Sequence, residues 1–303
     1  MPSPPPAPPP HGLLRDKVVL VTAAAGTGIG FATARRAVEE GATVVLSDWH
    51  ERRLAEAQQQ LAGLADKAPL AVPCDVTAEA QVQALIDAAY DSYGRLDVLV
   101  NNAGLGGTAE LVEMTDEQWS RVLDVTLTGT FRCTRAAMRR MLPAGSGVIV
   151  NNASVLGWRA QAGQAHYAAA KAGVMALTRC AAVEAAEHGV RVNAVAPSIA
   201  MHPFLAKVTS PELLAELASQ EAFGRPAEVW EVANVIVFLA SEESGGVTGR
   251  VFEVEGGVIS VATGWRHGPR EDKGARWDPA EVGAVVGRLL AQAPVPEPVY
   301  GAS

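Results

Sequence analysis

Short apolar runs rich in β-branched residues alternate with amphipathic segments along most of this chain. Seven of these runs have the length of buried strands: Lys17–Thr22, Thr43–Ser47, Leu70–Cys74, Leu96–Val100, Gly147–Asn152, Val190–Val195 and Val251–Val254. Between them, apolar residues recur with the helical period of about 3.6 residues, for example over Phe31–Glu40, Ala78–Tyr93, Asp116–Met141 and Tyr167–His188. Strands that alternate with helices form right-handed crossovers and a parallel sheet covered on both faces. The pattern predicts an α/β fold with a single Rossmann-type, doubly wound, parallel seven-stranded sheet.

The two ends of the chain differ in composition from this alternating middle. Residues 1–12 are mostly proline and predict a disordered leader. Residues 13–260 form the predicted catalytic domain, and residues 261–303 form a C-terminal extension. Within the extension, Asp278 and Pro279 suit the N-cap and the first position of one short helix.

Composition limits the partners that we expect. The 303 residues carry 25 Lys and Arg against 33 Asp and Glu, which gives a formal net charge of −8. This balance lacks the basic stripe of a nucleic-acid-binding protein, so no nucleic-acid partner is expected. No apolar run reaches the roughly 18 residues of a membrane helix, so no membrane insertion is expected. The three cysteines lie far apart and show no metal-ligand spacing, which predicts no metal site and a reducing, cytoplasmic location.

A glycine-rich turn follows the first predicted strand and leads into a helix. It consists of Gly26, Thr27, Gly28, Ile29 and Gly30. Because glycine has no Cβ, backbone N–H groups and the positive end of the helix can approach a pyrophosphate closely. The same glycines would also suit a tight turn without a ligand. The strand before the turn and the helix after it favour a dinucleotide-binding site.

Acidic and amide side chains follow the next strands. Asp48 ends the second predicted strand, 18 residues after Gly30, where a carboxylate accepts hydrogen bonds from the adenosine ribose and repels a 2′-phosphate. We therefore expect NAD, with NADP as the alternative because Arg52 and Arg53 could pair with such a phosphate. Ligands bind at the carboxyl ends of parallel strands, which adds five expected cofactor contacts: Asp75, Val76, Asn102, Ala103 and Gly104.

The most specific pattern is a serine followed by a tyrosine and a lysine. Tyr167 comes thirteen residues after Ser154, and Lys171 comes one helical turn after Tyr167. A nearby ammonium group lowers the pKa of a phenol from its usual value of about 10, so Tyr167 is the expected proton donor to a ketone. Tyr167 and Lys171 are also expected cofactor contacts, with Lys171 reaching the nicotinamide ribose. Ser154 would hydrogen-bond the substrate oxygen. Taken singly, these residues also fit a helix surface pair and a loop hydroxyl.

Together these features resemble the short-chain dehydrogenase/reductase superfamily over residues 13–260. The resemblance rests on the glycine turn, Asn101–Gly104, Ser154, Tyr167 with Lys171, Pro197, Gly224–Pro226, Val247–Gly249 and Glu255–Gly257. It implies an NAD(P)-dependent oxidoreductase that interconverts a secondary alcohol and a ketone by hydride transfer. It also implies that Pro197 and Ile199 contact the cofactor, and that the chain forms a homotetramer or homodimer through its long helices.

Three departures from the family pattern stand out. Ala23 occupies the first glycine position, and the turn Thr22–Gly30 is one residue longer than usual. Thr126 stands where the family has an asparagine that relays protons; the threonine could orient a water or simply pack with its methyl group. The segment Pro197–His202 lacks the threonine that usually contacts the nicotinamide carboxamide.

Within the superfamily, the chain resembles actinobacterial reductases of hydroindanone-propionyl-CoA thioesters, which act in sterol ring breakdown, and also 3-oxoacyl thioester reductases. The narrower likeness lies in Ala23–Gly30, Ser47–Arg53, Asn151–Ala160 and Pro197–Ala200. It implies a bulky, cyclic, steroid-derived CoA thioester as substrate. The candidate substrate contacts, each of which also fits a structural role, are Leu105, Leu156, Trp158, His202 and Phe204.

Two other functions stay open at this point. One is a reductase of linear 3-oxoacyl thioesters, which would use the same catalytic residues on an unbranched chain. The other is a nucleotide-binding regulatory protein without catalysis. The departures at Thr126 and His202 suggest it, whereas the presence of Ser154, Tyr167 and Lys171 argues against it.

Overall fold

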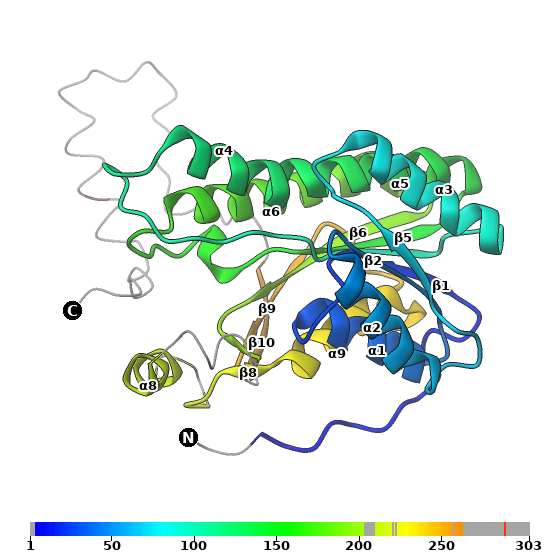
Figure 1. The fold of residues 1–303 in the computed structure, drawn as a ribbon, viewed down its shortest axis with the longest axis horizontal. Helices are drawn as coiled ribbons and strands as arrows, with labels where there is room; N and C mark the ends of the chain where they lie inside the picture. Colours follow the sequence, from blue (N-terminus) through cyan, green and yellow to red (C-terminus); the bar gives the residue numbers. More distant parts are fainter. Residues whose placement is uncertain are drawn as a thin grey trace.

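The centre of the protein is one twisted sheet, seen edge-on between two helical layers in Figure 1. The computed structural model describes residues 4–202, 210–219, 221, 223–256, 258–262 and 288. Seven parallel strands confirm the predicted sheet: β1 (Val18–Val21), β2 (Thr43–Asp48), β3 (Leu70–Pro73), β4 (Val98–Asn101), β5 (Gly147–Asn152), β6 (Val190–Pro197) and β9 (Val251–Glu255).

An eighth strand, β10 (Val258–Ala262), was not expected from the sequence. It pairs antiparallel with β9, with Val258 opposite Glu255. Only two residues separate β9 from β10, and so short a connection permits an antiparallel hairpin but no parallel crossover. The sheet therefore gains an antiparallel edge strand beyond its parallel part.

The strand order positions the functional site. It runs β10-β9-β6-β5-β4-β1-β2-β3, so the chain builds outward from β1 to β3 and then returns to place β4 on the other side of β1. Connections that leave β1 and β4 in opposite directions open a crevice at their carboxyl ends. Thr22, directly after β1, ties the two ends together, because its Oγ1 accepts hydrogen bonds from the backbone N–H groups of Asn102 and Ala103 at 2.9 and 3.0 Å.

Helices cover both faces of the sheet, as Figure 1 shows. One layer contains α1 (Ile29–Glu39), α2 (Glu51–Ala62) and α9 (Val229–Ala240). The other contains α3 (Glu79–Tyr93), α4 (Asp116–Leu123), α5 (Gly129–Ala144) and α6 (Ala165–Ala186). Each layer closes a separate apolar core against the sheet, the first around Leu46 and Ile236 and the second around Leu85 and Ile149.

The predicted helix over Asp116–Met141 is divided. Between α4 and α5 the structure has a π-helical turn, η1 (Asp124–Thr128). Gly129 lies directly after it, where a Cβ would stand 2.6 Å from Cγ2 of Val76, so the helix approaches the loop after β3 closely. The helical period alone does not predict such a turn, because one widened turn shifts the spacing of the apolar residues only slightly within a long helical pattern.

The remaining elements are short and lie near the carboxyl ends of the strands or at the edges of the fold. They are η2 (Val155–Gly157), η3 (Glu242–Ser244), α8 (Pro211–Ser219) and a two-stranded parallel pair of β7 (Ala200–Met201) and β8 (Ala227–Glu228). The leader has no helix or strand over residues 4–12, and Arg36 on α1 donates hydrogen bonds to the carbonyls of Pro8 and Pro9. Of the helix predicted in the extension, the structure describes Arg288 alone, which is helical. Among the described helices, none is long and apolar enough to cross a bilayer.

Candidate active site

Three cavities follow one another along the carboxyl edge of the sheet. The large cavity, about 740 Å³, extends from Asp48 to Gly104. The central cavity, about 550 Å³, extends from Gly104 to Tyr167. The small cavity, about 250 Å³, lies beyond Tyr167 and is bounded by Ser154 and Glu221. Neighbouring cavities share lining residues, Gly104 between the first two and Tyr167 between the last two, so together they form one crevice along this edge.

The glycine turn leaves room for a ligand at the start of α1. The N-cap of this helix is Gly28, and no side chain caps it, so the first N–H groups of the helix are available to a phosphate. A Cβ at Gly26 or Gly28 would meet no heavy atom within 4 Å, whereas a Cβ at Gly30 would stand 2.3 Å from the Ala23 carbonyl oxygen. The first two glycines thus keep the turn open, and Gly30 lets the turn pack on the helix. These features fit a pyrophosphate.

Asp48 connects this turn to the large cavity. The residue is buried, and its Oδ2 accepts a hydrogen bond from the backbone N–H of Ala25 at 3.2 Å. Arg53 lines the same cavity, whereas Arg52 pairs with Glu56 at 3.2 Å. The carboxylate and one of the two candidate phosphate-binding arginines therefore line the same cavity.

Most of the predicted cofactor contacts line the large or the central cavity. Those that line the large cavity are Asp48, Asp75, Val76, Ala103 and Gly104. Those that line the central cavity are Gly28, Ile29, Asn102, Gly104, Tyr167, Lys171 and Ile199. Gly26, Thr27, Gly30 and Pro197 do not line either cavity, although the first three belong to the turn beside them and the Pro197 carbonyl lies 3.5 Å from Ser154 Oγ.

Ser154, Tyr167 and Lys171 meet at the junction of the central and small cavities. Tyr167 lines both, Lys171 lines the central cavity, and Ser154 lines the small one. Ser154 caps η2, with its Oγ accepting a hydrogen bond from the backbone N–H of Leu156 at 3.2 Å. On α6, Lys171 Nζ lies 5.5 Å from the centroid of the Tyr167 ring and donates to the Asn152 carbonyl at 2.5 Å.

Burial dominates the titration of this pair. It raises the pKa of Tyr167 above its ordinary value, an effect that the hydrogen bond with Ser154 partly offsets. Burial also lowers the pKa of Lys171 to about 8. The net shift of the phenol pKa is therefore upward, opposite to the lowering expected from the neighbouring ammonium group. At neutral pH Tyr167 therefore carries its proton. Lys171 is still mainly protonated at this pH, because its pKa of about 8 is slightly higher.

Thr126, the candidate relay residue, forms two hydrogen bonds with a neighbouring loop. Its Oγ1 donates to the Leu105 carbonyl at 3.1 Å and accepts from the Leu105 backbone N–H at 3.0 Å. The side chain is fully buried within η1. The hydroxyl thus holds the loop after β4 in place beside Gly104.

The sequence of the chain is similar to those of known oxidoreductases. A family model described as "Enoyl-(Acyl carrier protein) reductase" matches residues 23–259. A reductase from Mycobacterium tuberculosis, (5R,7aS)-5-hydroxy-7a-methyl-1-oxo-2,3,5,6,7,7a-hexahydro-1H-indene-carboxyl-CoA reductase, is 66% identical over 80% of this chain and 94% of its own length. The chain belongs to the short-chain dehydrogenase/reductase family. It is an oxidoreductase of this family, whose cofactors are the nicotinamide dinucleotides, and the resemblance inferred from the sequence is confirmed.

Other members of the short-chain dehydrogenase/reductase family are similar over the same region. The cis-4-hydroxycyclohexanecarboxylate dehydrogenase of Sinomonas cyclohexanicum is 44% identical over 81% of this chain and 98% of its own length. The 3-oxoacyl-(acyl-carrier-protein) reductase of Thermotoga maritima is 42% identical over 81% of this chain and 99% of its own length. A solved short-chain dehydrogenase from Mycobacterium smegmatis has 59% identity and a TM-score of 0.75, and the match covers 83% of this chain and 96% of that one.

The predicted substrate contacts are dispersed along the short-chain dehydrogenase/reductase crevice. Leu156 lines the small cavity beside Ser154. Leu105 lines the large cavity instead, because Thr126 holds its backbone there. His202 lines the central cavity, and Trp158 lines none of the three. Phe204 lies outside the described residues.

Several residues of the site were not predicted from the sequence. Asn152 at the end of β5 binds Lys171 through its carbonyl, and its side chain donates to Asn102 Oδ1 at 2.8 Å. Ser198 and Glu221 line the small cavity and are hydrogen-bonded to each other. No local pattern marks these residues, because their roles depend on segments that meet only in the folded chain.

Proposed function

We propose that this enzyme interconverts a secondary alcohol and a ketone on a bulky, fused-ring CoA thioester, with a nicotinamide dinucleotide as cofactor. One observation carries the proposal: Tyr167 is common to the central cavity, beside the glycine turn, and to the small cavity beside Ser154. The 66% identity to a reductase named for a hydroxy-oxo-hexahydroindene-carboxyl-CoA supports the choice of substrate class.

The residues of the chain supply acid–base chemistry and orientation. The cofactor, when bound, supplies the hydride chemistry at the reacting carbon. In the direction of reduction, the Tyr167 hydroxyl donates its proton to the substrate oxygen, and in the direction of oxidation the phenolate accepts it. Ser154 hydrogen-bonds the same oxygen. The Lys171 ammonium, close to the ring, stabilises the phenolate left after proton donation.

Thr126 has a supporting part in this scheme. Its hydroxyl donates to the Leu105 carbonyl and accepts from the Leu105 N–H, so we propose a structural role for it and not a place in the proton route. We assign to it the positioning of the loop Gly104–Gly107 against the cofactor.

For the cofactor itself, we favour NAD. The Asp48 carboxylate is held beside the large cavity by the backbone N–H groups of Ala25 and His50, and a fixed negative charge there opposes a 2′-phosphate. Arg53 lines the same cavity and moderates this preference. The ratio of kcat/KM with NADH to kcat/KM with NADPH measures the cofactor preference. We expect this ratio to be above one in the wild type and to fall in Asp48→Asn. A ratio below one in the wild type would contradict the assignment.

We further propose a homotetrameric or homodimeric enzyme in the cytoplasm. Phe131 on α5 and Val183 on α6 are 40% and 80% exposed, as expected for helices that form interfaces between copies. All three cysteines are free, in agreement with a reducing compartment. Light scattering on the purified chain tests the assembly, and a monomeric mass at micromolar concentration would contradict it.

The two alternative functions have weaker support. A preference for linear 3-oxoacyl thioesters is suggested by the Thermotoga maritima relative, which is less similar than the hexahydroindene reductase. A non-catalytic regulatory role is opposed by the gathering of Ser154, Tyr167 and Lys171 at one cavity junction.

A substrate comparison tests the proposal. The full chain would be assayed by absorbance of the reduced nicotinamide with fused-ring keto CoA thioesters, linear 3-oxoacyl CoA thioesters and both cofactors. We expect kcat/KM to be at least about ten-fold higher for the ring substrate, because the linear chain fills the cavity less well. A preference for the linear thioester would favour the first alternative, and binding of cofactor without turnover of any substrate would favour the second.

A further inference from the structure

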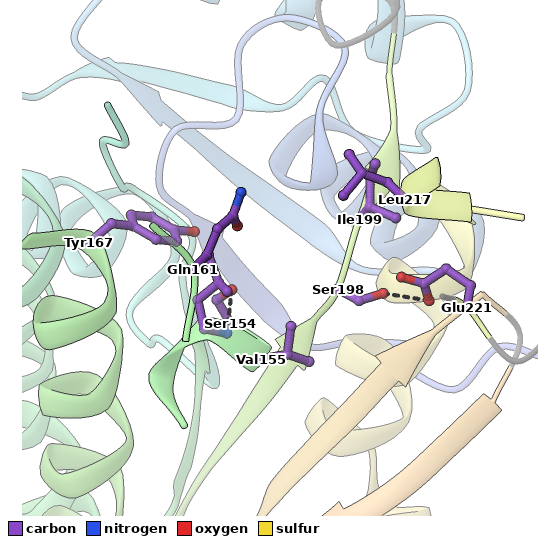
Figure 2. A pocket seen from close by; sticks show the side chains of 9 residues that line it. Ser154, Val155, Gln161, Tyr167, Ser198, Ile199, Leu217 and Glu221 are labelled. Atoms are coloured by element: carbon purple, nitrogen blue, oxygen red, sulfur yellow. Dashed lines mark hydrogen bonds between the residues drawn. The ribbon is translucent and has the colours of Figure 1, made fainter. Parts of the chain in front are cut away.

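The small cavity contains a buried carboxyl group to which the proposed reaction gives no task. Glu221 follows α8 and is only 5% exposed. Its Oε2 accepts a hydrogen bond from Ser198 Oγ at 2.8 Å, and both residues line the cavity. Figure 2 shows this pair on the side of the cavity opposite the Tyr167 hydroxyl, with the carboxyl group directed back across the cavity.

The polarity of the cavity is concentrated at its two ends. Between the Ser154–Tyr167 end and the Ser198–Glu221 end, the wall is apolar and consists of Val155, Leu156, Ile199 and Leu217. Gln161, the other polar lining residue, has an exposed side chain. Such a cavity accommodates an apolar body that has a polar group at each end.

The surroundings of Glu221 decide the kind of hydrogen bond it makes. Burial raises the pKa of its carboxyl group, and the nearby Glu255 carboxylate raises it further. Hydrogen bonds from Ser198 and from the backbone N–H of Ile199 act in the opposite direction, as does Arg159, which forms an ion pair with Glu255. The balance is a raised pKa, so the protonated form, which can donate a hydrogen bond, persists to a higher pH than in an ordinary glutamate.

We propose that Glu221, braced by Ser198, recognises a second carbonyl oxygen on the ring system of the substrate, at the end away from the reacting carbon. This inference rests on the proposed function, which places the reacting oxygen at Tyr167. It makes Glu221 a specificity-determining residue that selects rings with two oxygen functions over rings with one. The relative from Mycobacterium tuberculosis is named for a ring that carries both a hydroxyl and an oxo group, which is the pattern that such a cavity would select.

A pair of ring ketones and two variants test the assignment. The probes are a methyl-substituted fused five- and six-membered ring diketone and the matched monoketone that lacks the second carbonyl. Their dissociation constants would be measured by calorimetry on the full chain with oxidised nicotinamide dinucleotide bound, and their kcat/KM values with the reduced cofactor. The variants are Glu221→Gln, which keeps the length of the side chain and a hydrogen-bond donor, and Glu221→Met, which keeps the length but has no donor.

We expect the wild type to bind the diketone about ten-fold more tightly than the monoketone, as one buried hydrogen bond allows. Glu221→Gln should keep this preference. Glu221→Met should abolish it by weakening the diketone alone, because the monoketone makes no bond at that end of the cavity. Since both ketones are measured on the same variant, a general loss of stability does not imitate this result.

Three results would overturn the assignment: no preference in the wild type, a preference that survives in Glu221→Met, or an equal loss for both ketones in that variant. The last would mean that Glu221 only joins α8 to the end of β6. Failure of the proposed function has a different signature. In that case neither ketone supports consumption of the reduced cofactor, while the ratio of the two dissociation constants still decides the role of Glu221.

Discussion

Ala23 has a left-handed backbone conformation that is uncommon for a residue with a Cβ. Its φ is 49°, and its carbonyl oxygen accepts a hydrogen bond from Asn102 Nδ2 at 3.1 Å. The residue stands where the family has glycine, so the departure seen in the sequence has a structural cost of roughly 1–2 kcal/mol for the left-handed conformation.

We predict that Ala23→Gly stabilises the protein. Relief of the left-handed strain exceeds the greater chain entropy of glycine in the unfolded state, so the free energy of unfolding should rise by about 0.5–1 kcal/mol. Chemical denaturation measures this change. The neighbouring Ala24→Gly is the control, because Ala24 is fully buried and does not have a positive φ; it should lose stability. A loss of similar size in both variants would contradict the strain at Ala23.

Lys171 links stability to pH. Its pKa is lowered from 10.5 to about 8 by burial, so between these values the unfolded chain binds the proton more tightly than the folded chain. Stability contributed by this residue therefore increases as the pH rises through that window. Compared with Lys171→Met, the wild type should gain on the order of 3 kcal/mol of unfolding free energy between pH 7 and pH 10. Denaturation of both proteins across this range measures the difference, and a gap that does not change with pH would show that the lysine titrates normally.

Among the elements, η1 shows how a local irregularity in a helix supports the site. The π-helical turn brings the buried Thr126 hydroxyl to the backbone of Leu105, and π-turns inside α-helices occur frequently at functional sites. The loop that Thr126 holds contributes Gly104 to both the large and the central cavity. An ordinary helical turn would direct the residue elsewhere.

Removal of this hydroxyl should weaken both stability and cofactor binding. In Thr126→Val the partly buried N–H and C=O groups of Leu105 lose their partner, so we expect the unfolding free energy to fall by about 1–2 kcal/mol. The dissociation constant of the cofactor should increase several-fold because the loop loses its support. Thr126→Ser, which keeps the hydroxyl, is the matched control. If kcat instead falls by orders of magnitude while stability and binding are unchanged, Thr126 carries protons after all.

The elements that the sequence predicted well are those defined by local pattern. The run at Val18–Val21 is apolar over its whole length, and Val98–Asn101 is apolar up to its final asparagine, because both faces of a parallel strand are buried. This makes both runs visible without a structure. The spacing of Tyr167 and Lys171 is likewise local, since both lie on one helix. β10 was missed because it is a short strand defined by its pairing with β9, and η1 was missed because one widened turn shifts the spacing of the apolar residues only slightly.

At the scale of the whole molecule, the sequence could not predict contacts between residues that lie far apart in the chain. Ser198 and Glu221 come from the end of β6 and the residues after α8, and their contact depends on how α8 lies against the sheet. Leu105 was assigned to the substrate for a similar reason: its sequence neighbourhood is close to the catalytic residues, whereas its bond to Thr126 directs it to the cofactor side.

The central claim is that Tyr167 transfers the proton at the junction of the cofactor and substrate cavities. The most direct measurement is kcat for reduction of a fused-ring ketone by Tyr167→Phe, with cofactor affinity measured on the same preparation. Tyr93→Phe on α3, remote from the crevice lining, is the control. We predict that kcat falls by about 10²–10⁴-fold in Tyr167→Phe, with an unchanged dissociation constant for the cofactor and normal activity in the control. A Tyr167→Phe enzyme that retains the wild-type kcat would contradict the account.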